Sequence, residues 1–257
     1  MDQLRFADSC ESVVGTARKR LGIGTYQEKT VHAVVKQYME PDPANQEQKV
    51  GAFVADIRNE QGIIEIQTAN FNAMRKKLSV FLEQYPVTIV YPVPYRKWLY
   101  WIDPETGEVS RKRKSPKKGT PQMIFKELYK IRPFLSNPRL HFSILLIHME
   151  EYRLLNGWDR NKKRGSSRYD RIPICLEDQI DIEGKQSFGK LVPQGLPELY
   201  TTADFAKKAG ITVSDAQKAL LLLTELGITE RVGKKKNAYL YRTLIIEERS
   251  KSVKGEP

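Results

Sequence analysis

The stretch VGAFVADIRNEQGIIEIQT, residues 50–68, decides the fold, because it is typical of two neighbouring strands joined by a short turn. In its first half both alternating faces are small or apolar apart from Asp56, as expected of a strand that is buried on both sides. Residues 58–62, RNEQG, have the composition of a turn. We therefore predict a β-hairpin at the centre of a sheet, with one carboxylate in its buried part.

The register of this hairpin brings two acidic side chains together. If the hairpin closes on the middle of the turn, Ile57 faces Ile64, and Asp56 faces Glu65 with Cβ atoms roughly 5 Å apart. Like charges that face each other destabilise a sheet, so either one carboxyl group is protonated or a divalent cation lies between the two. The alternative is a tight turn whose polar residues only face solvent.

A hard cation such as Mg²⁺ suits a pair of carboxylates at the open edge of a sheet. Mg²⁺ uses one or two carboxylates, keeps several waters and completes its shell with phosphate oxygens of a substrate. Such a metal generates hydroxide from water and neutralises the charge that builds up on a phosphodiester. The pair Asp56 and Glu65 is therefore a candidate site for phosphodiester hydrolysis.

The spacing of this pair resembles the motif of a nuclease superfamily. Asp56 is followed, after eight residues, by Glu65, Ile66 and Gln67, and a predicted helix upstream carries Glu28. This arrangement resembles the PD-(D/E)XK superfamily, which has the restriction-endonuclease-like fold. The resemblance implies an α/β fold with a mixed central sheet flanked by helices, and a metal-dependent cleavage of DNA.

The resemblance also implies a role for each residue of the motif. Asp56 and Glu65 would be catalytic ligands of Mg²⁺ or Mn²⁺, and the backbone carbonyl of Ile66 would complete the metal shell. Gln67 stands where the superfamily usually has Lys. Because Gln supplies only a dipole where Lys supplies a positive charge, electrostatic stabilisation of the reaction should be weaker.

A helix is predicted upstream of the motif. Residues 25–28, TYQE, have the form of a capping box that opens a helix. Glu28 is therefore a helix cap, an auxiliary acid of the site, or both. His32, in the same helix, is interpreted as an ordinary helix residue and not as a ligand.

The composition favours a polyanionic partner. The 257 residues include 43 Lys and Arg against 31 Asp and Glu, which gives a net charge of +12 and a pI near 9.5. Such a surplus points first to nucleic acid and second to an anionic membrane surface. Cys10 and Cys175 have neither zinc spacing nor a disulfide framework. The sequence has no apolar run of about 18 residues and no signal-peptide core, so we expect a cytoplasmic protein.

Basic residues gather in three segments outside the motif. The predicted helix 70–84 carries Arg75, Lys76 and Lys77 on its outer side, either as a solvated face or as a phosphate contact. Residues 111–118, RKRKSPKK, are predicted to be a mobile loop that follows phosphates, and residues 157–171 to be a linker or an arm along nucleic acid. The candidate contacts of these two segments are Arg111, Lys112, Arg113, Lys114, Lys117, Lys118, Lys162, Lys163 and Arg164.

From residue 197 the pattern changes to two helices followed by two short strands. This order resembles a winged-helix domain, whose second helix, here 213–226, would enter a major groove. The four leucines at 220–223 cannot all face a small core, so the alternative is that this helix packs on the first domain or on another subunit. The candidate nucleic-acid contacts here are Gln217, Lys218, Lys234, Lys235 and Lys236.

These patterns predict five segments. They are a lead-in that is a short helix or irregular (1–24), a nuclease-like domain (25–156), a basic linker or arm (157–196), a winged-helix domain (197–246) and a disordered tail (247–257). We expect a Mg²⁺- or Mn²⁺-dependent endonuclease acting on DNA, with RNA as the alternative target and a homodimer or protein partner contacting the winged helix. The other interpretation is a DNA-binding regulator or assembly factor whose nuclease-like domain is inactive.

Overall fold

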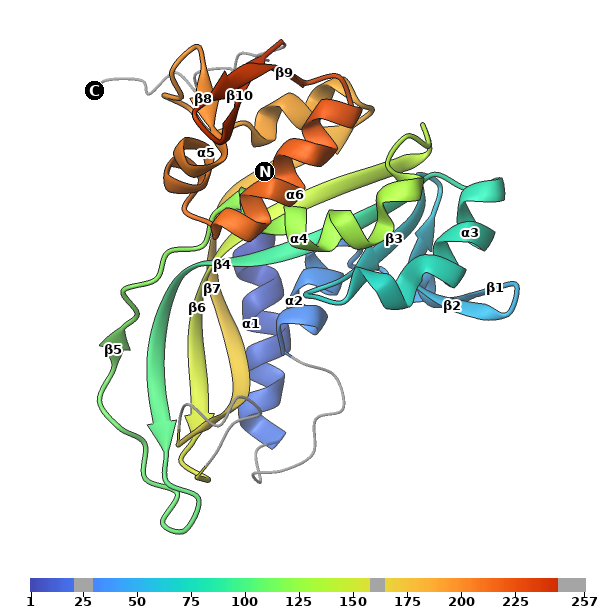
Figure 1. Ribbon diagram of the computed structural model, residues 1–257. Coiled ribbons are helices and arrows are strands. Elements are labelled where there is room, and N and C mark those ends of the chain that lie inside the picture. Colours follow the sequence, from blue (N-terminus) through green and yellow to red (C-terminus); the bar gives the residue numbers. More distant parts are fainter. Residues whose placement is uncertain (21–29, 158–164, 245–257) are drawn as a thin grey trace, which may run out of the picture.

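The computed structural model describes residues 1–20, 30–157 and 165–244. It is a mixed α/β protein in which helices flank a seven-stranded mixed sheet, while a smaller three-stranded sheet lies in the C-terminal part (Figure 1). The mixed α/β class expected from the sequence is therefore confirmed. The α-helices are α1 (Gln3–Arg20), α2 (Thr30–Met39), α3 (Arg75–Gln84), α4 (Phe125–Leu128), α5 (Thr202–Ala209) and α6 (Val213–Glu225).

The strands of the large sheet follow the order β1-β2-β3-β4-β6-β7, and β5 pairs with β4. The strands are β1 (Gln46–Val50), β2 (Phe53–Asn59), β3 (Gly62–Ile66), β4 (Val87–Ile102), β5 (Arg113–Lys114), β6 (Leu140–Leu154), β7 (Ser167–Glu183), β8 (Tyr200–Thr201), β9 (Thr229–Lys235) and β10 (Ala238–Thr243). Short 3-10 helices are η1 (Pro43–Asn45), η2 (Phe71–Met74), η3 (Pro121–Ile124), η4 (Tyr129–Phe134) and η5 (Gln186–Leu191).

The predicted hairpin is β2–β3, and its register is the expected one. Ile57 pairs with Ile64 and Asn59 pairs with Gly62 in an antiparallel ladder. On its other side β3 pairs in parallel with β4, and β4 pairs in parallel with β6. The hairpin therefore lies inside the sheet, which explains why both of its faces are apolar.

Two apolar cores form on opposite faces of the sheet. On one face α1 and α2 cover Ile57, Ile64 and Ile66, together with Phe6 and other apolar residues. On the other face α3, α4 and the C-terminal helices cover Ile63 and its neighbours. The first helix, expected as a short helix or irregular lead-in, is thus an 18-residue part of one layer, and its Phe6 is fully buried.

The two prolines of β4 lie where the neighbouring strand ends. Gln67 N–H donates to the carbonyl of Val90, so even-numbered residues in this part of β4 direct their backbone groups towards β3. Strand β3 ends opposite Val90. The N–H groups that Pro92 and Pro94 lack would therefore point to a side of β4 where β3 no longer pairs, so their absence breaks no β3–β4 hydrogen bond. Strand β4 therefore continues past both prolines to residue 102.

Past the end of β3 the sheet continues as a projection of three strands. We call residues 96–102 of β4, 148–154 of β6 and 167–175 of β7 the arm. Figure 1 shows the arm reaching away from α4 and from the C-terminal helices. Both long loops of the sheet start at its tip, because Ile102 pairs with Leu154 and Leu154 pairs with Ser167.

The prediction of a basic linker or arm over residues 157–196 is wrong where this segment forms a strand, and its residues 158–164 lie outside the described residues. Residues 167–183 form β7, which pairs with β6 along its whole length. The strand was missed because it lies at the edge of the sheet and its register shifts at three places, so its apolar residues do not alternate. The first domain, predicted to end at residue 156, therefore extends through β7, which is part of the large sheet.

The C-terminal elements agree closely with the predicted order of two helices and two strands. Thr201 caps α5 with a capping box, and Gly210 ends the helix in a left-handed conformation. Strands β9 and β10 pair with each other, and β8 adds a third strand on the other side of β10. Of the four leucines only Leu221 is exposed, at 38%, as the expectation of one outward leucine required.

Candidate functional site

Two carboxylates meet where β2 separates from β3. Above the Ile57–Ile64 pair the ladder stops, and the side chain of Asp56 takes the place of a strand partner. Its Oδ2 accepts the N–H of Ile66 at 2.7 Å, while the N–H of Asp56 donates to Oε1 of Glu65 at 3.3 Å. The two acids are thereby held against each other by the backbone of both strands.

Glu65 is the deeply buried member of the pair. The residue is 0% exposed, and its Oε2 accepts from Nζ of Lys77 on α3 at 2.7 Å. Burial and the charge of Asp56 raise the pKa of Glu65 to about 7, although Lys77 acts in the opposite direction. This carboxyl group therefore changes its charge near neutral pH.

Asp56 is the ionised member of the pair. Its burial acts to raise its pKa, but the hydrogen bond from His32 and the charges of His32 and Lys77 outweigh burial, so the pKa of Asp56 lies below its usual value. Nε2 of His32 lies 3.2 Å from Oδ2 of Asp56. His32 comes from α2 and Lys77 from α3, so the helix layers on the two faces of the sheet each bring one basic side chain to the pair.

The other predicted residues of the motif have different outcomes. Ile66 lies in the site through its N–H, and Gln67 is half-buried just beyond the end of β3. Gln67 has its backbone N–H bonded to Val90 and lies two residues after Glu65, on the same face of the strand. Glu28 lies outside the described residues.

The sequence interpretation missed two residues of the site, His32 and Lys77. His32 was interpreted as an ordinary helix residue, yet it contacts Asp56. The expectation that Lys77 lies with Arg75 and Lys76 on the outer side of the helix is wrong, because Lys77 turns towards the sheet and bonds Glu65. Its position three residues after the buried Met74, on the buried side of α3, is the signal that identifies it.

The basic loop 111–118 lies along the arm. All six of its basic residues are exposed, and its Arg113 and Lys114 form β5 on the edge of β4. Lys112 also bonds Glu150 at 3.1 Å. Arg75 and Lys76 are exposed on α3, and the candidates Lys162, Lys163 and Arg164 lie outside the described residues.

The C-terminal candidates differ in exposure and in contacts, and Nζ of Lys234 lies 4.9 Å from the ring centre of Tyr239. Gln217 on α6 is exposed, whereas Nζ of Lys218 bonds Asp215 at 3.0 Å. Lys234, Lys235 and Lys236 are exposed at the β9–β10 turn, where Lys236 has a φ of 55°. The opposite side of α6 packs against α4 in one continuous core, and Arg132 forms an ion pair with Glu225.

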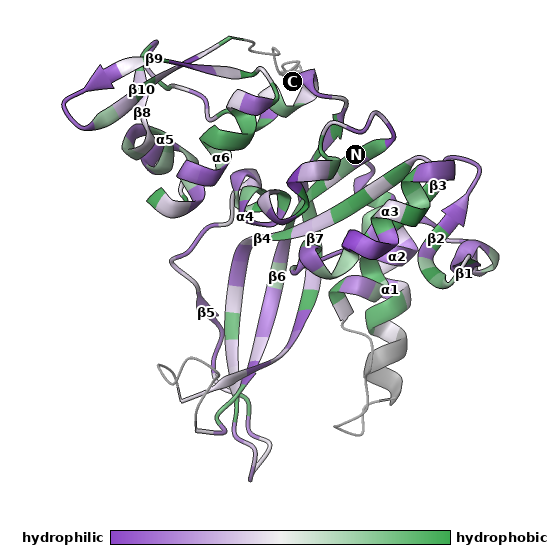
Figure 2. Ribbon diagram, turned by 45° about the vertical axis from the view of Figure 1, so that its right-hand side comes forward, coloured by the Kyte–Doolittle hydropathy of each residue, from purple (hydrophilic) through white to green (hydrophobic). Residues whose placement is uncertain are grey.

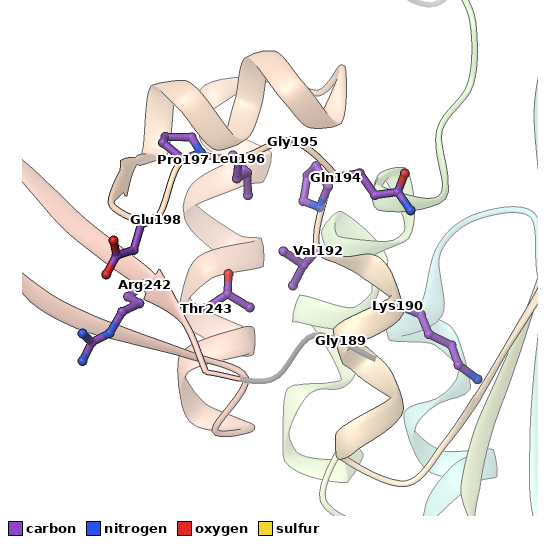
Figure 3. A pocket seen from close by; sticks show the side chains of 11 residues that line it. Gly189, Lys190, Val192, Gln194, Gly195, Leu196, Pro197, Glu198, Arg242 and Thr243 are labelled. Atoms are coloured by element: carbon purple, nitrogen blue, oxygen red, sulfur yellow. The ribbon is translucent and has the colours of Figure 1, made fainter. Parts of the chain in front are cut away.

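A cavity of about 350 Å³ lies elsewhere, between the segment that follows η5 and strand β10 (Figure 3). Val192, Leu196 and Pro197 line it, and Figure 3 shows Glu198 and Arg242 at its rim. Neither Asp56 nor Glu65 belongs to its wall. The cavity is thus separate from the carboxylate pair.

Within the described ranges, His, Cys, Asp and Glu side chains do not gather in groups of three or more that could hold a metal ion. At the carboxylate pair, Asp56 and Glu65 are the two acidic side chains that could bind a cation. In the same part of the chain, none of the helices is long and apolar enough to cross a membrane.

The fold and site define a mixed α/β protein with a buried, coupled pair of carboxylates. The chain belongs to the family described as a domain of unknown function (DUF8091), which matches residues 29–183. The match extends from the start of α2 to the end of β7 and so covers the large sheet. An uncharacterized protein of Treponema pallidum (strain Nichols) is 27% identical over 221 residues, which are 86% of this chain and 87% of the relative. No solved structure matches the chain significantly.

Proposed function

We propose that this protein is a metal-dependent deoxyribonuclease that hydrolyses phosphodiester bonds at Asp56 and Glu65. The observation that carries the proposal is the contact of these two acids at the point where β2 leaves β3. Holding a buried carboxylate beside a second one is costly, as the raised pKa of Glu65 indicates. Strongly shifted acids of this kind are concentrated at functional sites.

The arrangement of elements around the pair supports the resemblance to PD-(D/E)XK nucleases. That resemblance implies an acid on one strand, a second acid on the next strand and a helix upstream. Asp56 on β2, Glu65 on β3 and helix α2 have this arrangement. The mixed sheet with helices on both faces is also what the resemblance implies.

The residues at the pair fit a hard divalent cation. Asp56 and Glu65 would hold Mg²⁺ or Mn²⁺ through carboxylate oxygens, the ligands that these ions prefer. The N–H and C=O of one strand residue point to the same edge, so Ile66, whose N–H bonds Asp56, would add its carbonyl on that side. The bound ion would lower the pKa of water and neutralise charge on the phosphodiester.

The protein's own basic side chains have distinct tasks in this proposal. Lys77 places a positive charge beside Glu65, and this charge is the one that Gln67 cannot supply. His32 keeps Asp56 ionised, so at least one carboxylate is ready to bind a cation at neutral pH. Gln67, on the same face as Glu65, would orient water or phosphate through its amide.

Exposed basic residues would hold the DNA. Arg75 and Lys76 lie on the outer side of α3, the helix that brings Lys77 to the site. The order β8, α5, α6, β9, β10 supports the resemblance to a winged helix, and Lys234, Lys235 and Lys236 would contact phosphate at the wing. The core shared by α6 and α4 would tie this part to the proposed nuclease domain.

A second candidate function is binding of DNA without cleavage, as a regulator or assembly factor. The observation that favours it is that both acids already have a basic partner, since His32 contacts Asp56 and Lys77 contacts Glu65. With these partners the pair is partly neutralised without a metal. Lys77 would then be a structural ion pair and not part of a reaction.

Cleavage of DNA by the full chain tests the proposal. Supercoiled plasmid, single-stranded DNA and branched DNA are incubated with Mg²⁺ or Mn²⁺, and products are separated on gels. We expect Asp56→Asn and Glu65→Gln each to slow cleavage by at least about 100-fold while DNA binding in EDTA is retained. Glu60→Gln, which changes an exposed acid in the same hairpin, is the matched control and should cut normally. If the wild-type protein cuts none of these DNA forms with either metal, the binding-only function holds.

A further inference from the structure

One face of the arm carries a row of aromatic rings. In the β4–β6 ladder Trp98 pairs with Glu150 and Tyr100 pairs with Tyr152, so these four side chains share a face. The rings of Tyr100 and Tyr152 stack at 4.9 Å with an angle of 8°, and those of Trp98 and His148 stack at 5.7 Å with an angle of 26°. We call Trp98, Tyr100, His148 and Tyr152 the ring face.

The ring face lies beyond the helices that cover the same side of the sheet. Leu146 on β6 belongs to the core beneath α4 and the C-terminal helices, and His148 is the next residue on that side. The views of Figures 1 and 2 agree that α4 and the C-terminal helices end above the arm. Trp98, Tyr100 and Tyr152 are half-buried, so each of these residues is partly exposed to solvent.

Positive charge surrounds the ring face. Nζ of Lys112 lies 5.0 Å from the ring centre of Trp98, and Nζ of Lys118 lies 4.3 Å from that of Tyr95. Both lysines belong to the exposed segment 111–118, which runs beside β4 through the β4–β5 pairing. Glu150 is the acid between the rings, and it accepts from the hydroxyls of Tyr100 and Tyr152 as well as from Lys112.

We propose that the ring face binds single-stranded nucleic acid. Bases would stack on the exposed parts of the rings, and the basic residues of 111–118 would contact the phosphates that connect those bases. Proteins that bind single strands combine these two features, because every base has a π-face and every nucleotide carries a charge. In a duplex the base faces are already stacked on each other, so rings of this kind select unpaired strands.

Charge decides between this ligand and a second copy of the protein. A sheet face that pairs with its own copy would bring two segments of six basic residues together, and like charges in contact are costly. A polyanion neutralises the same residues. This inference rests on the proposed nuclease function and extends it to the substrate. The DNA that is cut would carry an unpaired strand or flap that reaches the arm.

The test measures binding of single-stranded and duplex DNA in EDTA, with Asp56→Asn as the background so that cleavage does not enter. Fluorescence anisotropy follows a labelled oligothymidylate of about 16 nucleotides and a duplex of equal length. We expect Trp98→Ala and Tyr152→Ala each to weaken single-strand binding about 10-fold and duplex binding less than about 2-fold. Trp98→Phe keeps a ring at this position and should bind nearly as well as the background protein.

Trp101 provides a matched control, because it lies on the same strand but on the opposite face. It pairs with Arg153, whose side chain bonds Glu151 on that other face. Trp101→Ala should bind single strands normally. The inference is overturned if Trp101→Ala weakens binding as much as Trp98→Ala, if Trp98→Ala has no effect, or if Trp98→Ala changes the mass measured by light scattering. If the wild-type protein cuts no DNA with Mg²⁺ or Mn²⁺, the proposed nuclease function fails, but single-strand binding measured in EDTA still tests the ring face independently.

Discussion

Lys77 on α3 and Glu65 on β3 are joined by a hydrogen bond of 2.7 Å, although they are twelve positions apart in the chain. The acid is buried and the lysine side chain is 20% exposed, so the pair connects the interior of the sheet with its surface. Gln67 leaves the motif without a positive charge, and Lys77 brings one to the same strand from the neighbouring helix. Two helices thus define the electrostatics of a site whose acids lie on strands.

The first prediction concerns the charge of Lys77. Lys77→Met should slow metal-dependent cleavage about 100-fold, because the positive charge beside the reacting phosphate is lost. Lys77→Arg should restore part of the rate. Lys76→Met, which removes an exposed lysine one position earlier, is the control and should affect binding only weakly. If Lys76→Met and Lys77→Met slow cleavage equally, the cleavage rate depends only on the total charge of α3 and not on the contact of Lys77 with Glu65.

The second prediction concerns stability and pH. Because the pKa of Glu65 is raised to about 7 in the folded protein, its contribution to stability is present below its ordinary pKa and is lost as pH rises through 7. Glu65→Gln removes this dependence. Its free energy of unfolding, measured with urea in the absence of metal and taken relative to wild type, should therefore be larger at pH 8 than at pH 5, by up to ~3 kcal/mol. A difference between variant and wild type that does not change with pH would contradict the raised pKa.

The third prediction concerns His32. His32→Ala removes the hydrogen bond and charge that keep the pKa of Asp56 low, so the pKa of Asp56 should rise. The acid limb of the rate against pH should then move to higher pH, while the rate at pH 8 changes less. His32→Gln, which can still donate a hydrogen bond, should give an intermediate curve. A uniform loss of rate at all pH values would instead indicate a structural role for His32.

The fourth prediction concerns the turn that holds the two acids in register. Gly62 has a φ of 120°, and a Cβ at this position would lie 2.4 Å from the carbonyl oxygen of Pro86. Gly62→Ala should lower the free energy of unfolding by about 2 kcal/mol or more. Gly15→Ala is the control, since Gly15 is helical with open space around it, and it should stabilise α1 by about 0.5–1 kcal/mol. Denaturant unfolding followed by circular dichroism measures both changes.

The hairpin could be predicted because the information it needs is local. Strand side chains alternate with period two, so the turn at residues 58–62 is sufficient to pair Ile57 with Ile64. The partners of the acids could not be predicted in this way. His32 and Lys77 reach the site only because α2 and α3 pack on opposite faces of the sheet, and no spacing in the sequence records that arrangement.

Two strands are hard to predict from the sequence, for a physical reason. Prolines such as Pro92 and Pro94 usually end a strand or confine it to an edge, but their effect depends on whether a neighbour needs their missing N–H groups, and β3 ends just before them. Strand β7 has bulges and one unpaired edge, so its polar and apolar residues do not follow the pattern of an interior strand. Both features depend on neighbouring strands and not on the segment itself.

The burial of Phe6 has a practical consequence for work on this family. The family match begins at residue 29, yet helix α1 packs its fully buried phenylalanine into the core on one face of the sheet. A recombinant fragment cut at the limits of the match would keep α2 but lose α1, which leaves part of that face uncovered and prone to aggregate. The unit to express, crystallise and assay therefore starts ahead of the recognised domain, at the first helix.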